Sequence, residues 1–296
     1  MKGGPDLRVP FTKLHGVGND YLFIDLVRQP MVLPDLPGLA RAMSHRRLGV
    51  GADGIILVLP SKAADFAMRT FNADGSEAEM CGNGLRCLAR LVFERGHTRL
   101  QQFTVQTGAG IMRPELVVEA GQVTRVRVDL GPPRLARREI PLAADAEQDD
   151  QPVVRQQLEA DGRVWCFTAV SMGNPHCVIA VPDVGEVDLE RVGPRIEWHS
   201  LFPRRTNVEF VQVLDRSRLR MRIWERGSGV TAGSGTGSAA ATVACVLEGR
   251  CDRRVQVVMD GGEVEVEWRD DGRIFQTGPA VEVFQGEFPV GGRGTC

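Results

Sequence analysis

The sequence predicts an α+β protein made of two related, strand-rich halves, and three observations carry that prediction. The chain has 296 residues, which is long for one hydrophobic core and suits two domains. Short apolar runs bounded by glycine or polar residues recur along it, whereas few stretches show helical spacing. Similar motifs also return in the second half at a nearly constant distance.

The returning motifs indicate an internal duplication. The run Cys-Gly-Asn-Gly at 81–84 matches Ser-Gly-Thr-Gly at 234–237, residues 68–71 match 221–224, and Gly18-Asn19 matches Gly173-Asn174, at offsets of 153, 153 and 155. One match between glycine-rich turns would be chance, but three matches in order favour duplication. We therefore expect two pseudo-symmetric domains, residues 1–131 with 280–296 and residues 132–279, each a mixed sheet or barrel wrapped around a central helix.

The expected elements follow the same plan in both halves. In the first half, strands are predicted at 21–26, 55–59, 66–71, 103–108, 110–118 and 123–130, with helices at 36–45 and 85–96. In the second half, strands are predicted at 153–158, 163–170, 177–181, 208–214, 219–224, 255–259, 263–268, 274–277 and 280–288, with helices at 189–196 and 238–248. The polar stretch 134–151 after Pro132-Pro133 reads as a linker. The final strand has no first-half counterpart, so we expect it to cross back to the first domain.

Composition excludes several classes of function. A net charge of −2 gives no electrostatic case for nucleic acid or a membrane surface. Without a membrane-length apolar stretch or the hydrophobic core of a signal peptide, the chain is expected in the cytoplasm. Seven cysteines, an odd number without ligand spacing, argue against both a disulfide framework and structural zinc.

Two glycine-rich turns that lead into helices are the best candidates for chemistry. Cys81 stands where the first turn becomes a helix, and Ser234 holds the same place in the second half. Free N–H groups and the positive dipole end favour a thiolate there and also bind a carboxylate. A thiol of pKa ~8.5, lowered at a helix end, serves as base or acid near neutral pH. Two such helix ends would form a site in the interdomain cleft, where a proton leaves one face of a carbon and returns to the other.

Taken together, the motifs resemble the diaminopimelate epimerase family. The resemblance rests on Gly-Val-Gly-Asn-Asp-Tyr at 16–21, Phe-Asn-Ala-Asp-Gly-Ser at 71–76, the Cys81 motif, Gly-Asn-Pro-His at 173–176, Asn207-Val208 and Glu-Arg-Gly-Ser-Gly at 225–229. It implies an isomerase that converts LL- to meso-2,6-diaminopimelate for lysine and peptidoglycan synthesis. It also implies no cofactor, no metal and a possible homodimer, with the small amino acid as the partner.

The resemblance implies a role for each matching residue. Cys81 is one catalytic residue, and the position of the second is Ser234. The residues implied to hold the reacting carboxylate are Gly82, Asn83, Gly235 and Thr236; those implied to recognise the distal amino-acid centre are Asn72, Asn207, Glu225 and Arg226; and Asn19, Asn174 and His176 complete the pocket. Taken alone, Glu225 and Arg226 would be interpreted as a surface ion pair.

Ser234 departs from the family pattern, because the family carries its second catalytic cysteine there. A hydroxyl ionises poorly at neutral pH, so the two-thiol mechanism does not carry over unchanged. Three interpretations stay open: an epimerase of diaminopimelate or of another amino acid, a single-thiol lyase or dehydratase of the proline-racemase-like kind, and a binding protein without turnover. The distal set at 72, 207, 225 and 226 speaks against the lyase, and the retained Cys81 speaks against the binding protein.

Overall fold

Two sheet-rich units make up the structure. The computed structural model describes residues 7–33, 35–143 and 149–290. Unit 1 runs to Val128 and takes in the chain from Pro279 onward, and unit 2 is Asp129–Gly278. The described residues hold four α-helices among nineteen strands, which confirms the α+β class. No helix in this part of the chain has the length and apolar character needed to cross a membrane.

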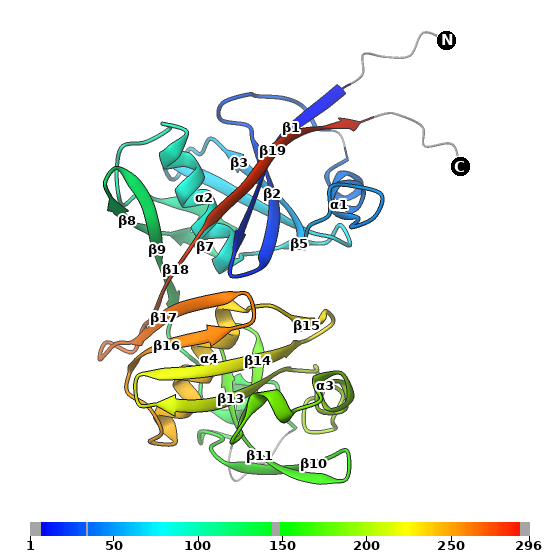
Figure 1. Ribbon diagram of the computed structural model, residues 1–296, viewed down its shortest axis with the longest axis vertical. Helices are drawn as coiled ribbons and strands as arrows, with labels where there is room; N and C mark the ends of the chain where they lie inside the picture. Colours follow the sequence, from blue (N-terminus) through cyan, green and yellow to red (C-terminus); the bar gives the residue numbers. More distant parts are fainter. Residues whose placement is uncertain (1–6, 34, 144–148, 291–296) are drawn as a thin grey trace. The chain divides into compact units, whose positions relative to one another are not determined.

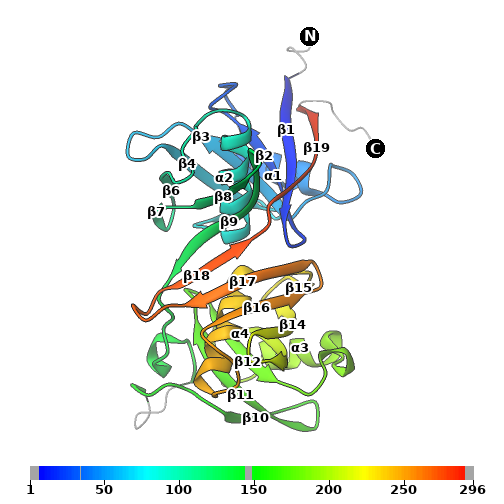
Figure 2. The same ribbon diagram turned by 60° about the vertical axis from the view of Figure 1, so that its left-hand side comes forward.

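Unit 1 combines a sheet, the antiparallel strand pair β8–β9 outside that sheet, and two helices (Figure 1). Its strands are β1 (Leu7–Gly16), β2 (Asn19–Asp25), β3 (Gly54–Leu59), β4 (Phe66–Asn72), β5 (Glu77–Ala78), β6 (Val105–Thr107), β7 (Gly110–Met112), β8 (Glu115–Glu119), β9 (Gln122–Gly131), which reaches the boundary, and β19 (Val281–Val290). Its helices are α1 (Leu36–Ser44) and α2 (Gly82–Glu94). Strand β19 lies antiparallel to β1 along nearly its whole length, which Figure 2 shows.

Unit 2 repeats this composition. Its strands are β10 (Gln156–Ala160), β11 (Arg163–Ser171), β12 (Pro175–Ala180), β13 (Asn207–Asp215), β14 (Arg218–Glu225), β15 (Gly229–Thr231), β16 (Arg254–Met259), β17 (Gly262–Trp268) and β18 (Ile274–Gly278). Its helices are α3 (Leu189–Glu197) and α4 (Gly235–Leu247), with short 3₁₀ turns at Arg137–Glu139 and Val184–Glu186.

The two units share one strand order. The first sheet runs β19-β1-β2-β3-β4-β6-β7 with β5 beside β4. The second runs β10-β11-β12-β13-β14-β16-β17-β18 with β15 beside β14, and its order then continues with β9 and β8. The pairs β2–β3 and β12–β13 are parallel, as are β4–β6 and β14–β16. Parallel neighbours need a crossover connection, and the four α-helices lie in these four connections.

Strand register shows the duplication at the level of single residues. Ile55 lies opposite Phe71 in unit 1, and Val208 lies opposite Trp224 in unit 2, each 153 residues further on. The short strands match as well, because Thr70 pairs with Ala78 and Ile223 with Thr231. The same backbone plan is therefore built twice from different side chains.

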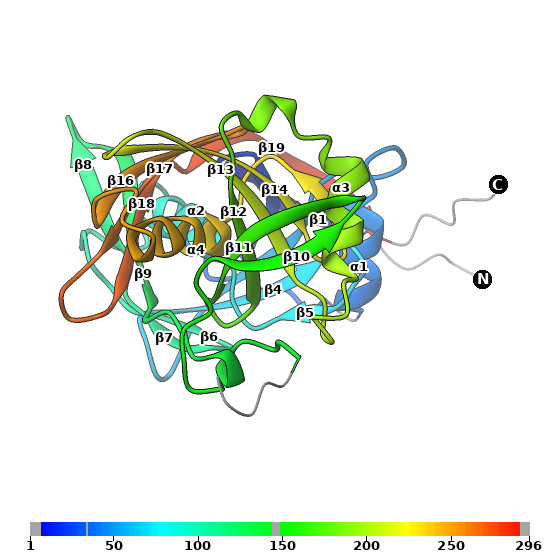
Figure 3. The same cartoon turned by 90° about the horizontal axis from the view of Figure 1, so that it is seen from below.

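Each unit keeps one helix at its centre. Helix α4 packs against strands β11 to β14 and β16 to β18 of its own sheet, and Figure 3 shows those strands around it. It is buried on nearly all sides, as its run of alanine, threonine and valine requires. In unit 1, α2 packs against β1, β2 and β8, with Leu85, Leu88 and Val92 fully buried. These contacts fix both helix N-termini on rigid elements.

Two sequence-based expectations are corrected by the structure. The stretch 134–151 was expected as a linker, but its described part packs onto unit 2: Ile140 and Leu142 are buried in that core, and Arg134 exchanges backbone hydrogen bonds with Ser171. Burial of these two apolar side chains holds the segment on the core although most of its other residues are polar. Residues 144–148 lie outside the described part. The single strand expected at 110–118 is two strands, β7 and β8, while β5 and β15 are too short for sequence periodicity to reveal.

Candidate active site

Cys81 and Ser234 cap their helices in the same way. Cys81 has φ −136° and ψ 116°, and its Sγ accepts a hydrogen bond from the Gly84 N–H at 3.3 Å. Ser234 has φ −133° and ψ 128°, and its Oγ accepts from the Gly237 N–H at 3.2 Å. Both are N-caps, so the first N–H groups of each helix point away from the helix body without helical partners.

A glycine in each first turn allows the close packing beneath these caps. A Cβ on Gly84 would lie 2.4 Å from Ile56 Cδ1, and one on Gly237 would lie 2.9 Å from Ile223 Cδ1 and 3.1 Å from Glu209 Oε1. Side chains of strands β3, β13 and β14 therefore touch the helix backbone directly. Close packing is therefore one reason for glycine at these two positions.

In unit 1, the side-chain oxygen of Asn19 accepts hydrogen bonds from both the Cys81 thiol and the Asn83 amide. Asn19 Oδ1 accepts from Asn83 Nδ2 at 3.1 Å and from Cys81 Sγ at 3.5 Å, while its Nδ2 donates to Asp53 at 2.7 Å. Asn83 Oδ1 accepts from the buried Arg86 at 2.6 Å. The predicted residues Asn19, Cys81 and Asn83, with Gly82 between the last two, are thus brought together.

The protonation of Cys81 differs from the sequence-based expectation. Burial raises the pKa of the Cys81 thiol above its ordinary value, even though the Gly84 N–H, Tyr21 and Arg86 each act to lower it. The helix end therefore has the expected direction of effect, but desolvation of the thiolate is larger. Burial and the neighbouring Cys81 also raise the pKa of Tyr21 well above its usual range. Burial lowers the pKa of Arg86 to about 10, which still leaves it positive at neutral pH.

In unit 2, the corresponding positions hold a different hydrogen-bond chain. Asn174 Nδ2 donates to Thr236 Oγ1 at 3.3 Å, and Asn174 Oδ1 lies 3.0 Å from His176 Nε2. His176 Nδ1 lies 2.6 Å from Glu209 Oε1, and both of these side chains are fully buried. Both ring nitrogens of His176 are therefore engaged by residues other than Ser234.

The predicted distal set is spread over both units. Asn207 lies at the start of β13, where its Oδ1 accepts from the Arg226 backbone N–H at 2.9 Å. Arg226 donates to the Arg204 carbonyl at 3.1 Å, and Glu225 accepts from Thr231. Asn72 belongs to unit 1, where its amide donates to Ser76 at 3.0 Å. Asn207, Glu225 and Arg226 are thus neighbours in unit 2.

Sequence reasoning passed over four residues that hold the candidates in place. Tyr21 and Asp53 contact the Asn19 and Cys81 pair, Arg86 orders Asn83, and Glu209 binds His176. A charged residue in an apolar run was the available signal for Glu209, which interrupts the run Val208 to Val211. Arg86 carries a similar signal, because it lies between buried Leu85 and Cys87 on a central helix.

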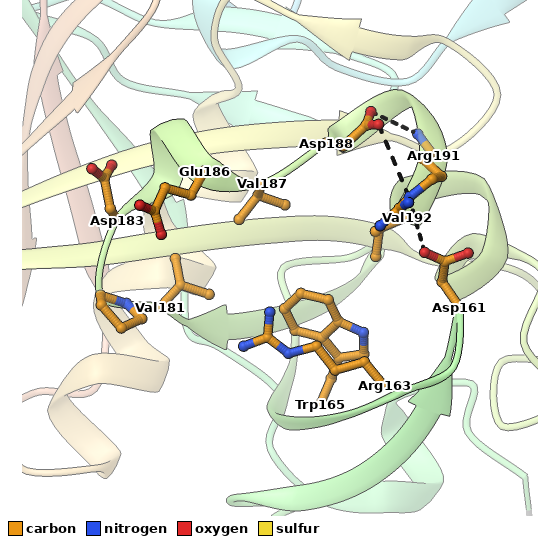
Figure 4. A pocket seen from close by; sticks show the side chains of 11 residues that line it. Asp161, Arg163, Trp165, Val181, Asp183, Glu186, Val187, Asp188, Arg191 and Val192 are labelled. Carbon is orange, nitrogen blue, oxygen red and sulfur yellow. Dashed lines mark hydrogen bonds and ion pairs between the residues drawn. The ribbon is translucent and has the colours of Figure 1, made fainter.

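A separate pocket of unit 2 contains none of the predicted residues (Figure 4). It has a volume of about 240 Å³ and lies beside Trp165, whose ring is covered by the Arg163 guanidinium at 4.2 Å. Carboxylates line its rim, and two of them, Asp161 and Asp188, form ion pairs with Arg191. The volume is below that of most small-molecule sites. Among the residues described, no three His, Cys, Asp or Glu side chains are grouped as metal ligands.

Comparisons with known proteins agree on one family. The family model described as diaminopimelate epimerase matches residues 11–136 and 168–283. A protein of Moorella thermoacetica named diaminopimelate epimerase is 52% identical over 281 residues, covering 95% of this chain and 99% of its own length. One of Pelotomaculum thermopropionicum with the same name is 52% identical over 279 residues, covering 94% and 98%.

Solved structures with low identity share the fold. The phenazine biosynthesis protein of the PhzF family from Bacillus anthracis has a TM-score of 0.70 at 18% identity, covering 96% of this chain and 100% of its own. A probable proline racemase from Agrobacterium radiobacter K84 has a TM-score of 0.71 at 14% identity, covering 97% and 94%. At these identities the likeness extends to the fold alone.

Proposed function

The chain belongs to the diaminopimelate epimerase family, a family of isomerases, and we propose that in this member Cys81 and Ser234 are the groups that exchange protons at the α-carbon of diaminopimelate. The reaction is the interconversion of LL- and meso-2,6-diaminopimelate in lysine biosynthesis. It needs no cofactor, because the proton acceptor and donor are side chains. The proposed setting is a cytoplasmic homodimer, with domains 1–131 plus 280–296 and 132–279.

The observation that carries this assignment is the matched pair of helix caps. Cys81 and Ser234 have nearly the same φ and ψ, and each accepts from the N–H three residues later. Each therefore sits beside free N–H groups at a helix N-terminus, where a carboxylate is stabilised. Negative charge that develops on the carboxylate of a carbanion-like transition state is stabilised in the same way.

The remaining residues receive roles in binding. Gly82 and Asn83 on α2, with Gly235 and Thr236 on α4, would hold the reacting carboxylate. The distal centre would be bound by Asn72, Asn207, Glu225 and Arg226, and the pocket would be completed by Asn19, Asn174 and His176. The contacts of Asn207 with Arg226, and of Asn174 with Thr236, support the grouping within unit 2.

Ser234 makes the proposed proton exchange one-sided. The Cys81 thiol ionises more readily than the Ser234 hydroxyl, so its thiolate can remove the α-proton that points at it. The hydroxyl of Ser234 is a weaker acid, so it returns a proton to the opposite face less readily. Solvent exchange at the Cys81 face should therefore outpace inversion.

The test incubates the protein with LL- and with meso-diaminopimelate in D2O and follows deuterium uptake and isomer ratio by NMR. Deuterium uptake that exceeds inversion, and that is lost in Cys81→Ala, supports the assignment. Exchange that survives in Cys81→Ala refutes it. An elimination product in place of either isomer would instead support the single-thiol lyase. Binding without exchange or product would support a binding protein.

A further inference from the structure

A fully buried acid and imidazole lie under the first turn of α4. Glu209 and His176 are both 0% exposed, with Glu209 Oε1 2.6 Å from His176 Nδ1. The other carboxyl oxygen, Oε2, has no hydrogen-bond partner among the described residues. An ionised carboxylate with a buried, unpaired oxygen is costly, and burial raises the pKa of Glu209 although His176 opposes the shift. A protonated carboxyl avoids this cost, and its O–H then donates to His176 Nδ1.

The direction of this bond determines the direction of the bonds that follow it. When Glu209 donates to Nδ1, neutral His176 carries its own proton on Nε2. That N–H donates to Asn174 Oδ1 at 3.0 Å, which turns Asn174 Nδ2 toward Thr236 Oγ1 at 3.3 Å. Thr236 Oγ1 is then an acceptor, so its single O–H proton remains available to another acceptor. Thr236 is only half-buried, so a ligand can reach it.

Unit 1 does not repeat this chain of donors. Strand register places Tyr21 where unit 2 has His176, and Ile56 where it has Glu209. Ile56 meets the helix turn with a methyl group near Gly84, whereas Glu209 meets it with a carboxyl oxygen near Gly237. The acid is thus a feature of unit 2 alone and is not required by the shared backbone.

We propose that Glu209 is a positioning residue, which donates to His176 and thereby keeps the Thr236 hydroxyl free to donate to a substrate carboxylate. The inference rests on the proposed function, in which Thr236 binds that carboxylate. Glu209 itself stays away from the substrate. No covalent bond is made or broken, and the proton on Glu209 remains with the pair.

The experiment compares the full-length protein with Glu209→Gln and Glu209→Ile. Glutamine keeps a donor for His176 Nδ1, whereas isoleucine copies residue 56 of unit 1 and removes the donor. Titration calorimetry with meso-diaminopimelate gives the dissociation constant of each protein. In parallel, 15N-labelled histidine reports which ring nitrogen of His176 carries a proton, with the signal assigned by its loss in His176→Phe.

The parent and Glu209→Gln should show His176 protonated on Nε2 alone and should bind with similar affinity. Glu209→Ile should bind about tenfold or more weakly, as expected for one lost hydrogen bond to a charged group. If Glu209→Ile does not fold, Thr236→Val replaces it and should weaken binding by a similar factor.

Three results would overturn the proposal: a proton on Nδ1 of His176 in the parent, a loss in Glu209→Gln as large as in Glu209→Ile, or unchanged binding in Glu209→Ile and Thr236→Val. The first concerns protein without ligand and therefore decides the direction of the bond whatever the substrate. Failure of the parent itself to bind diaminopimelate would refute the proposed function instead, and the histidine signal would still test Glu209.

Discussion

Replacing Ser234 by cysteine should raise the rate of inversion at the α-carbon far more than the rate of deuterium exchange at the Cys81 face. The cap of α2 shows that a cysteine fits this geometry, because Cys81 holds nearly the same φ and ψ and accepts from the Gly84 N–H at 3.3 Å, against 3.2 Å for Ser234 and Gly237. Ser234→Cys should therefore fold with little change in stability. Complete loss of an N-cap costs about 0.5–2 kcal/mol, and this exchange should cost less because cysteine keeps a cap.

The gain in inversion rate expected for Ser234→Cys comes from replacing a weak proton donor with a thiol. A positioned general acid or base contributes about 10²–10⁴-fold to a rate. A gain of only tenfold in inversion corresponds to about 1.4 kcal/mol in the barrier, and we expect at least that much in Ser234→Cys. Exchange at the Cys81 face should change much less, because Cys81 and the two helix ends are the same in both proteins.

The assay measures both rates on one sample. LL-diaminopimelate and meso-diaminopimelate are incubated in D2O with parent and Ser234→Cys protein, and NMR gives deuterium uptake and isomer ratio over time. Ser234→Ala is the matched control, and it should invert no faster than the parent. Equal inversion rates in parent and Ser234→Cys would refute the reasoning, because another group or a water molecule would then donate the proton. His176 is not that group in this structure, since Glu209 and Asn174 engage both of its nitrogens.

Three further predictions concern reactivity, pH and stability. Iodoacetamide should label exposed Cys166 first in the free protein, whereas an electrophilic diaminopimelate analogue should label Cys81, and mass spectrometry locates the label. Burial raises the pKa of the Cys87 thiol to about 12, so labelling of Cys87 would contradict both expectations. Because burial raises the pKa of Cys81, the thiolate forms only as pH rises, so deuterium exchange should increase from neutral toward alkaline pH; a rate that falls over this range would exclude Cys81 as the base. Phe210→Ala should cost about 3–5 kcal/mol in the free energy of unfolding, since this ring is fully buried 5.3 Å from that of Trp165, and denaturant titration should show a loss far smaller in exposed Phe284→Ala.

Sequence periodicity was sufficient for the long elements and for the repeat. Offsets of 153 in the motifs reappear as offsets of 153 in strand register, because a duplicated hydrophobic pattern selects the same pairing twice. Segments of two or three residues, such as Glu77–Ala78 and Gly229–Thr231, have no period to detect. The linker prediction for 134–151 was wrong because it rested on the average polarity of the segment. Burial of only two side chains, Ile140 and Leu142, is enough to hold the segment against the core.

The site was predictable in its backbone and less so in its electrostatics. A helix N-terminus can be recognised from Gly-rich sequence followed by apolar spacing, so the positions of Cys81 and Ser234 at the starts of α2 and α4 were predictable. Desolvation of Cys81 depends on what covers the thiol, which no local pattern shows. The bond between His176 and Glu209 joins residues 33 positions apart on neighbouring strands, and only parallel pairing of β12 with β13 brings them together.

The two units have the same backbone geometry at their central helices but different side chains beneath the helix N-termini. The helix N-termini of α2 and α4 repeat one capping geometry, so both present N–H groups of the kind that bind a carboxylate. The groups beneath them differ: Arg86 brings a buried positive charge to Asn83 beside Cys81, whereas a chain of hydrogen bonds, proposed above to join neutral groups, runs from Glu209 to Thr236. A positive charge favours the ionised form of a neighbouring acid, and neutral donors do not. In the proposed mechanism, Arg86 therefore partly offsets the burial that raises the pKa of Cys81, while the Ser234 side holds the carboxylate with hydrogen-bond donors. Under this proposal, substituting Ser234 alone should change the group that returns the proton and leave the binding of the substrate unchanged.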